Sequence, residues 1–169
     1  MTEENVSNTG AVEGDADTQF ALQRIYLKDL SFETPMGVDA FQRELKPQIG
    51  QELSTNITQL DDAHFEVVLV LTITVKDGED VVYLVEVHQA GVFKVKGLEK
   101  PQMAQVLNVY CPATIYPYAR EVVDNVVIKG SFPALMLPPV NFDALFAQAL
   151  AERQAKKDQS DSSDSEVTH

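Results

Sequence analysis

A proline-rich, strongly apolar stretch near the C-terminus constrains the fold of this chain more than any other feature. Residues 130–140 read GSFPALMLPPV and contain three prolines, Pro133, Pro138 and Pro139. Proline fixes φ and lacks a backbone N–H, so this stretch cannot form a regular helix or a central strand. We call it the strap and predict an extended loop. Because so apolar a loop is poorly suited to water, it should cover a core or line a groove that holds other apolar chains.

Helix-forming segments lie on both sides of the strap. The segment from about Ala113 to Lys129 has helical periodicity, and Gly130 is a good C′ residue for its end. After the strap, Asn141 is a favourable N-cap for a short second helix. The apolar side chains of that helix form one stripe at helical spacing: Phe142, Leu145, Phe146, Ala149 and Leu150. A helix this short must pack on other parts of the molecule to be stable.

The first of these helices has an unusually wide apolar face. Its main stripe consists of four residues: Ile115, Ala119, Val122 and Val126. Val123 and Val127 extend the stripe sideways, by roughly a quarter turn at about 3.6 residues per turn. One sheet can cover only part of such an arc. We therefore predict that the main stripe forms an oligomer interface, most simply with another copy of the chain.

The middle of the chain has the alternating pattern of β-strands. Between Phe65 and Lys76, every odd position holds a large apolar residue, which places these side chains on one face of a strand. Similar patterns predict three further strands, at residues 24–33, 49–57 and 81–95. Asp77-Gly78 is a strong hairpin signal between the last two strands. Four strands followed by two helices predict an α+β fold, a four-stranded antiparallel sheet with two helices on one side.

Composition and charge limit the class of protein. The 169 residues suffice for one domain, which we expect to span 19–151 between disordered tails at 1–18 and 152–169. The net charge of −13, with no basic stripe, argues against nucleic-acid binding and favours a basic protein partner. The sequence shows no signal peptide and no membrane-spanning segment, so we expect a cytoplasmic protein that does not insert into membranes.

No residue pattern points to catalysis, a metal site or a cofactor. The single cysteine, Cys111, cannot form an internal disulfide or a thiolate cluster. His64, His88 and His169 lack the spacing of metal ligands. The chain also lacks a glycine-rich phosphate loop, so ATP use is not expected. We therefore expect neither an enzyme nor a protein that carries a metal or cofactor.

Six segments of the chain carry a family resemblance through their order and spacing. They are QRIYLKDLSFE at 23–33, EVHQAGVF at 86–93, CP at 111–112, YPYARE at 116–121, GSFPAL at 130–135 and PVNFDALF at 139–146. Together they resemble the SecB family of protein-export chaperones, over the whole chain apart from its tails. The resemblance implies a homotetramer, built as a dimer of dimers, without catalysis. Such a protein binds unfolded secretory preproteins without ATP, keeps them competent for translocation and delivers them to the SecA motor.

The resemblance also implies a docking site for SecA on the sheet. Asp29, Glu33, Leu84 and Glu86 match positions where the family docks the basic, zinc-carrying C-terminal tail of SecA. That zinc belongs to SecA. Strand alternation predicts that Asp29 and Glu33 share one face and that Tyr26 lies on the other. A face edged with carboxylates suits a basic partner.

A client-binding groove is the third feature that the resemblance implies. The family builds it from the loop after the first strand, the last strand, the strap and the final helix. We expect the groove to contain Met36, Val38, Phe41, Leu45, Tyr83, Phe93, Met103, Phe132, Leu135, Leu137 and Phe142. Methionine and aromatic side chains suit a surface that accepts many sequences. Leu45 departs from the family pattern, which has a tryptophan at this place.

Two other functions remain open at this point. A SecB-like chaperone dedicated to a toxin–antitoxin system would keep the same fold and groove but bind one client, although the acidic docking positions favour the export form. A small-molecule binding domain would instead use a closed apolar pocket with a few convergent polar groups. A pull-down from cytosol separates them: preproteins and SecA indicate export, one toxin indicates the dedicated form, and neither indicates the ligand binder.

Overall fold

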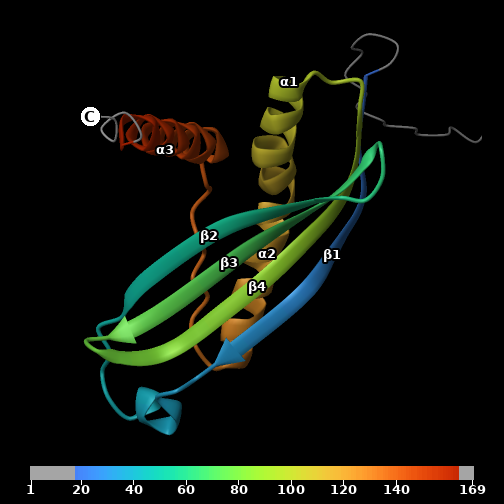
Figure 1. The fold of residues 1–169 in the computed structure, drawn as a ribbon. Coiled ribbons are helices and arrows are strands. Elements are labelled where there is room, and N and C mark those ends of the chain that lie inside the picture. Colours follow the sequence, from blue (N-terminus) through green and yellow to red (C-terminus); the bar gives the residue numbers. More distant parts are fainter. Residues whose placement is uncertain (1–17, 164–169) are drawn as a thin grey trace, which may run out of the picture.

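The structure is a computed structural model that describes residues 18–163. It contains a sheet, a long helix and a second helix that leaves the body of the molecule (Figure 1). The strands are β1 (Gln19–Glu33), β2 (Gln48–Gln59), β3 (His64–Asp77) and β4 (Asp80–Lys96). The helices are η1 (Gly37–Phe41), α1 (Lys100–Gln105), η2 (Val106–Tyr110), α2 (Cys111–Lys129) and α3 (Phe142–Ser163).

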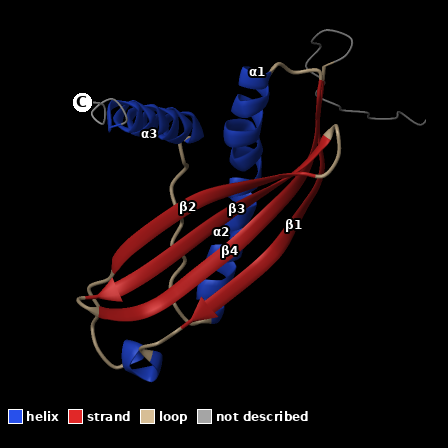
Figure 2. Cartoon of the chain, viewed as in Figure 1, coloured by secondary structure: helices blue, strands red, loops and turns tan. Residues whose placement is uncertain are grey.

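The four strands form one antiparallel sheet in the order β1-β4-β3-β2 (Figure 2). Strands β2, β3 and β4 follow one another as hairpins, and Gly78 takes a φ of 63° in the tight turn after β3, a conformation that suits glycine. Strand β1 pairs with the free edge of β4, so the chain crosses from β1 to β2 through η1. The predicted α+β fold with a four-stranded antiparallel sheet is confirmed, although β1 begins at Gln19 rather than at 24.

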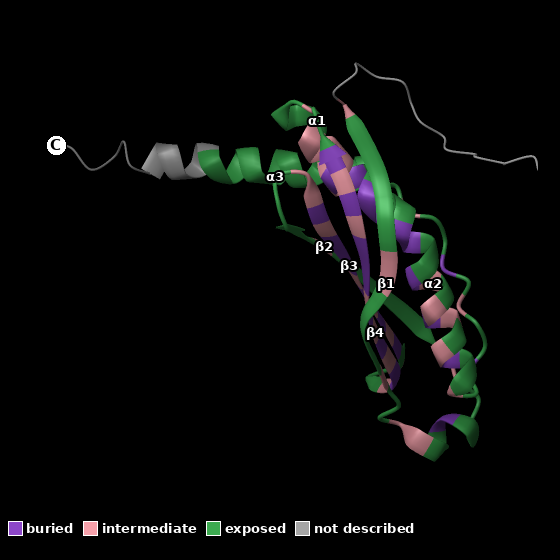
Figure 3. Cartoon of the chain, turned by 90° about the vertical axis from the view of Figure 1, so that its right-hand side faces the viewer, coloured by how far each residue is buried: buried purple, intermediate pink, exposed green. Residues whose placement is uncertain are grey.

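Buried and less buried residues alternate along much of β3 and β4 (Figure 3), so the two faces of the sheet differ in burial. We call the face under α2 the inner face. On it Val67, Leu69, Leu71 and Ile73 of β3 are fully buried, as the alternation predicts. We call the opposite side the outer face, which carries polar side chains such as Glu66 of β3. Burial of these apolar side chains stabilises the fold by roughly 1.5–3 kcal/mol for each one.

The long helix begins earlier than the sequence pattern indicated. Segments α1, η2 and α2 follow one another without a break, so helical structure starts at Lys100 rather than near Ala113. Pro101 lies in the first turn, where its missing N–H costs nothing, and Glu99 with Gln102 forms a capping box. The π-helical turn η2 lies directly before Pro112, which cannot donate the usual hydrogen bond to the carbonyl four residues back.

At the end of α2, the residue that turns the chain is not the predicted one. Gly130 has a φ of −79°, whereas Ser131 takes the left-handed conformation at 67°. The Ser131 N–H donates to the Ile128 carbonyl and the Phe132 N–H donates to the Val127 carbonyl, each at 3.0 Å. These bonds form a Schellman motif with Ser131 at C′. Gly130 is required by packing instead, because a Cβ there would lie 2.4 Å from the Phe32 ring.

Helix α3 starts where Asn141 predicted. The Asn141 side chain accepts a hydrogen bond from the Ala144 N–H at 3.0 Å, which is the N-cap geometry. The helix continues to Ser163 and so passes the domain boundary expected at 151. Residues 152–163 of the expected C-terminal tail therefore belong to α3. The rest of that tail, 164–169, and residues 1–17 of the expected N-terminal tail lie outside the described residues, and their mobility stays a prediction.

None of the helices that the structure describes combines the length and the apolar character needed to cross a membrane.

Candidate binding groove and acidic face

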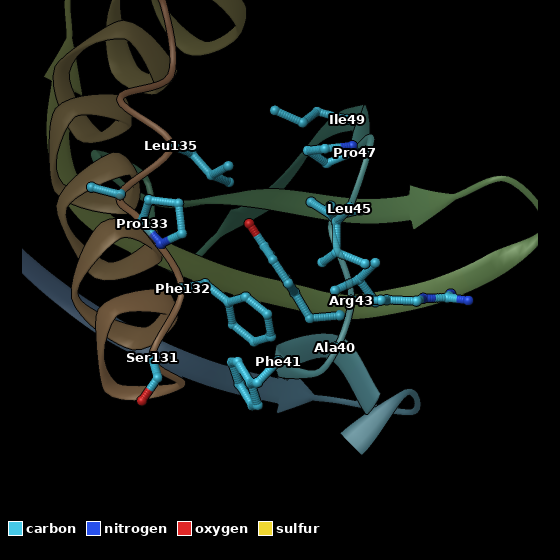
Figure 4. A pocket seen from close by; sticks show the side chains of 14 residues that line it. Ala40, Phe41, Arg43, Leu45, Pro47, Ile49, Ser131, Phe132, Pro133 and Leu135 are labelled. Carbon is cyan, nitrogen blue, oxygen red and sulfur yellow. The ribbon is translucent and has the colours of Figure 1, made fainter. Parts of the chain in front are cut away.

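An apolar groove of about 510 Å³ lies between the strap and the crossover that joins β1 to β2 (Figure 4). The crossover and the start of β2 form one wall, with Ala40, Phe41, Arg43, Leu45, Pro47 and Ile49. The strap forms the opposite wall, with Ser131, Phe132, Pro133, Ala134 and Leu135. Strands β3 and β4 supply the floor, with Val75, Val82 and Tyr83. Three segments far apart in the sequence therefore meet in one apolar surface.

Aromatic rings run across the groove. The ring centroids of Phe132 and Tyr83 are 4.6 Å apart, and those of Phe132 and Phe41 are 5.2 Å apart. Tyr83 also packs on Phe32 at 6.0 Å. Burial, and then the nearby negative charge of Asp124, raises the pKa of the Tyr83 phenol above its ordinary value. Phe41 is 56% exposed, so part of this aromatic row is open to a partner.

The only charged side chain in the groove lining is engaged by its own neighbours. The Arg43 guanidinium lies 3.4 Å from the Asp77 carboxylate and 3.1 Å from that of Asp80. Among the described residues that line the groove there is no carboxylate, histidine or thiol for acid–base or nucleophilic chemistry. What the groove offers a ligand is contact with apolar atoms, worth about 25 cal/mol for each Å² removed from water.

Five of the eleven residues expected in the groove lie together in it: Phe41, Leu45, Tyr83, Phe132 and Leu135. Two more lie beside it on the crossover, where Met36 contacts the Arg43 guanidinium through sulfur at 3.7 Å and Val38 is 65% exposed. Leu137 continues the strap but is buried. Sequence reasoning missed Pro47 and Ile49, because Ile49 belongs to the alternating pattern of β2 and its 54% exposure depends on where α2 stops covering the sheet.

Phe93 was wrongly expected in the groove. It lies on the inner face of β4 with no exposed surface, and its ring stacks on Phe20 of β1 at a centroid distance of 6.0 Å. The alternation of β4 points Phe93 into the core, and the groove lies at the other end of that strand, near Tyr83. Phe93 therefore contributes to the stability of the sheet and cannot contact a client in this structure.

Met103 and Phe142 also lie away from the groove. Phe142 is buried at the start of α3, where its ring meets Tyr116 of α2 edge-on at 5.8 Å. It borders a smaller hollow of about 300 Å³ between α3 and β2, which also includes Leu53 and Phe146. Met103 lies in α1 and packs partly buried against the core. The final helix therefore does not cover the groove, contrary to the expectation that it would form part of it.

The four residues expected to dock SecA lie next to one another on the outer face. Strand register pairs Glu33 of β1 with Leu84 of β4, Ser31 with Glu86, and Asp29 with His88. We call Asp29, Glu33, Leu84 and Glu86 the acidic face. The His88 ring nitrogen Nε2 lies 2.8 Å from a Glu86 carboxylate oxygen. The face therefore presents three carboxylates and one leucine on neighbouring strands.

Tyr26 lies on the outer face, although simple alternation placed it on the other side from Asp29. Register shifts in β1, one of them between Leu27 and Asp29, mark a bulge that moves Tyr26 to the same face. There its hydroxyl donates to the Glu66 carboxylate, which also accepts from Lys28 at 2.7 Å. These two hydrogen bonds, that from Lys28 first, lower the pKa of Glu66. The pattern failed because a bulge depends on pairing with β4.

The expected oligomer stripe on α2 is divided between two environments. Ile115 and Ala119 are fully buried under the sheet side of the helix, so assigning them to an interface was wrong. They fall on the same face as Val123 and Val127, which the sheet also covers. Val122 and Val126 are only partly buried and pack against the edge of the core. More exposed apolar side chains lie on the uncovered side of the long helix: Tyr110, Tyr118 and Ile128.

Cys111 and His64, which were considered for reactive chemistry, are held in buried or hydrogen-bonded positions. Cys111 is fully buried, and burial raises the pKa of its thiol to about 12, which keeps it protonated and unreactive. His64 pairs with the Asp61 carboxylate at 2.8 Å in the β2–β3 turn. Within residues 18–163 no group of three or more histidine, cysteine, aspartate or glutamate side chains is placed to hold a metal ion.

An open apolar groove and a separate acidic face are typical of the class of proteins that bind other polypeptide chains. The sequence profile of the family described as preprotein translocase subunit SecB matches residues 13–153. The protein-export protein SecB of Marinobacter nauticus is 55% identical over 142 residues, which is 84% of this chain and 86% of that protein. The corresponding protein of Saccharophagus degradans is 50% identical over 155 residues, or 90% and 92% of the two chains. The chain belongs to the SecB family of protein-export chaperones.

A solved structure supports the fold. The SecB-like chaperone Rv1957 of Mycobacterium tuberculosis, in complex with a ChAD peptide from the HigA1 antitoxin, superposes with a TM-score of 0.58. The likeness covers 72% of this chain and 90% of that one at 15% sequence identity. At this identity the match establishes that the two proteins share a fold.

Proposed function

We propose that this protein binds unfolded secretory preproteins in the apolar groove and hands them to SecA through the acidic face. The observation that carries the proposal is the separation of the two surfaces within a SecB-family fold. The groove lies between the strap and the crossover, and the acidic face lies on the other side of the sheet. A client can then stay bound while the motor docks.

The groove suits unfolded chains because it selects for apolar character and little else. Its walls come mostly from two loops, which can repack more easily than strands, and its floor combines two valines with Tyr83. Each apolar side chain of a client that enters the groove gains about 25 cal/mol per Å², less the cost of ordering that part of the client. A long preprotein gains further by occupying grooves on several subunits at once. Binding of this kind needs neither catalysis nor a cofactor.

The acidic face suits the basic tail of SecA by charge. Asp29, Glu33 and Glu86 place three negative charges on neighbouring strands, and Leu84 offers an apolar contact among them. Attraction of this kind raises the association rate and falls with added salt. We further propose a cytoplasmic homotetramer, a dimer of dimers, in which the uncovered side of the long helix is buried between copies. Tyr118 and Ile128 are exposed on that side, and the partly buried Val122 and Val126 lie at the edge of the core.

The dedicated toxin–antitoxin function is less well supported. The chaperone that binds the antitoxin peptide is only 15% identical to this chain, whereas the export proteins reach 50% and 55%. The small-molecule function requires convergent polar groups in a closed pocket. The groove is apolar instead, and its one charged side chain is paired with Asp77 and Asp80.

A holdase assay tests the proposed function. A secretory preprotein that keeps its signal peptide is diluted from urea into a solution of the wild-type protein without ATP. The preprotein should bind, and its folding should become slower. Loss of binding when Phe41 is changed to Ala would locate the client in the groove. Failure of the wild-type protein to bind any unfolded preprotein, or binding of a single toxin–antitoxin client alone, would contradict the proposal.

A further inference from the structure

The wall that the strap contributes to the groove is held by a side chain that does not line it. The strap leaves α2 through the Schellman motif at Ser131, which fixes Phe132 through its N–H. That motif reaches no further along the chain. The far end of the strap is held by Tyr116, whose hydroxyl donates to the Pro138 carbonyl at 2.8 Å. Between these two anchors lies Leu135, the groove residue at the middle of the strap.

Asp124 supplies the missing anchor. One of its carboxylate oxygens, Oδ1, accepts hydrogen bonds from the Leu135 N–H at 2.9 Å and from the Met136 N–H at 3.1 Å. These two amides are eleven and twelve residues away along the chain. Bonds from backbone N–H groups to a carboxylate are stronger than those to a neutral acceptor. Asp124 therefore fixes the strap to α2 where the helix itself offers no partner.

The backbone at this point needs such an anchor. Met136 has a φ of 50°, a left-handed conformation that an unbranched non-glycine residue adopts only at a cost. Its side chain is 77% exposed, so packing contributes little to holding this conformation. With the turn held, Leu135 points from the strap toward Pro47 and Ile49 on the opposite wall (Figure 4). Without it, the unfavourable conformation would relax and Leu135 would leave that position.

We propose that Asp124 is a positioning residue of the groove, which sets the place of Leu135 and thereby the shape of the strap wall. It acts through the backbone of the strap rather than by contact with a client. Its effect on client binding rests on the proposed function, whereas its effect on the strap does not. The two effects are measured separately.

Amide hydrogen exchange on the unmodified protein tests the anchor directly. The Leu135 and Met136 amides should exchange at least about tenfold more slowly than that of Ala134, which is exposed like Met136 but donates no hydrogen bond that the structure shows. Equal exchange at Ala134 and Met136 would overturn the proposal without any variant and without any client.

Variants extend the test to client binding. Asp124→Ala should speed exchange at Leu135 and Met136 about tenfold and weaken binding of an unfolded preprotein about fivefold. Asp124→Asn keeps an acceptor oxygen and should restore most of both properties. Glu121→Ala is the matched control, because Glu121 lies one turn earlier on α2, is exposed and bonds only to Asn125 of the same helix among the contacts shown.

The outcomes separate the two proposals. If the wild-type protein binds the preprotein and Asp124→Ala binds it with the same affinity, the positioning role is overturned. It is also overturned if Asp124→Asn and Asp124→Ala show the same exchange rates and the same preprotein affinity. Absence of preprotein binding by the wild-type protein contradicts the proposed function instead, and the exchange measurement still decides the role of Asp124. If Asp124→Ala does not fold, Asp124→Asn and the exchange pattern of the wild-type protein decide it.

Discussion

The inner and outer faces of the sheet are made by the same strands and yet carry opposite kinds of surface. On the inner face, β3 and β4 bury valine, leucine and isoleucine under α2, and the apolar surface emerges as the groove where that cover ends. On the outer face the alternate residues of the same strands include Glu66 and Glu86. Each of these strands therefore contributes side chains to a buried apolar surface and to a charged one. Paired residues from the two kinds of surface should therefore respond to substitution in different ways.

The largest effect is expected from a charge placed on the inner side of α2. Val123 is fully buried, whereas Val122, its neighbour in sequence, is only partly buried. Val123→Asp would bury an unpaired carboxylate at a cost of several kcal/mol and should abolish cooperative thermal unfolding. Val122→Asp should keep the far-UV circular dichroism spectrum but split the proposed tetramer into dimers or monomers, which light scattering measures. A wild-type protein that stays monomeric at micromolar concentration would remove the basis for the second expectation.

The next largest effect separates the core from the groove. Phe93 is fully buried and Phe41 is 56% exposed, although the sequence predicts both phenylalanines in the groove. Phe93→Ala should lower the free energy of unfolding by about 3–5 kcal/mol. Phe41→Ala should change stability little but weaken preprotein binding about tenfold, equivalent to about 1.4 kcal/mol. Urea titration and preprotein titration of both variants measure the difference. Selective loss of binding in Phe93→Ala would show that the groove extends along β4.

Local patterns predicted the strands well because alternation is set by the chain itself. Phe65, Val67 and their odd-numbered neighbours are buried on the inner face as expected, and the hairpin at Asp77-Gly78 joins β3 to β4. The N-cap at Asn141 was also correct, since a cap depends only on the next few residues. The family resemblance placed the acidic face, whose four residues lie together.

Features that depend on distant parts of the chain could not be read in this way. The bulge that moves Tyr26 to the outer face is created by pairing with β4. Which side of α2 meets the sheet decides that Ile115 is core and Val122 is not, and periodicity alone cannot choose between them. Asp124 gave no signal in the sequence, because its two partners lie eleven and twelve residues away in an irregular loop.

The smallest effect is expected on the outer face, from Glu66. Its pKa is lowered by hydrogen bonds from Lys28 and Tyr26, so it contributes stability above its unfolded pKa and loses that contribution as the pH falls through its folded value. Glu66→Gln should therefore lower the melting temperature at pH 7 by about 2 °C or less, and the difference should shrink as the pH falls below about 4.3, the ordinary pKa of glutamate. Glu52→Gln, an exposed outer-face change on β2, is the control. If the difference in melting temperature between the wild-type protein and Glu66→Gln grows in acid, the expected contribution of Glu66 is contradicted.

The central claim is that the groove and the acidic face act independently, and paired titrations test it most directly. One set of variants reverses charge at Asp29, Glu33 and Glu86, and the other is Phe41→Ala with Leu135→Ala. Each is titrated against an unfolded preprotein and against SecA at low and high salt. The charge reversals should weaken SecA binding more than tenfold at low salt and reduce its salt dependence, with preprotein affinity unchanged. The groove variants should do the opposite. Equal losses for both partners from both sets would show one shared surface and contradict the account.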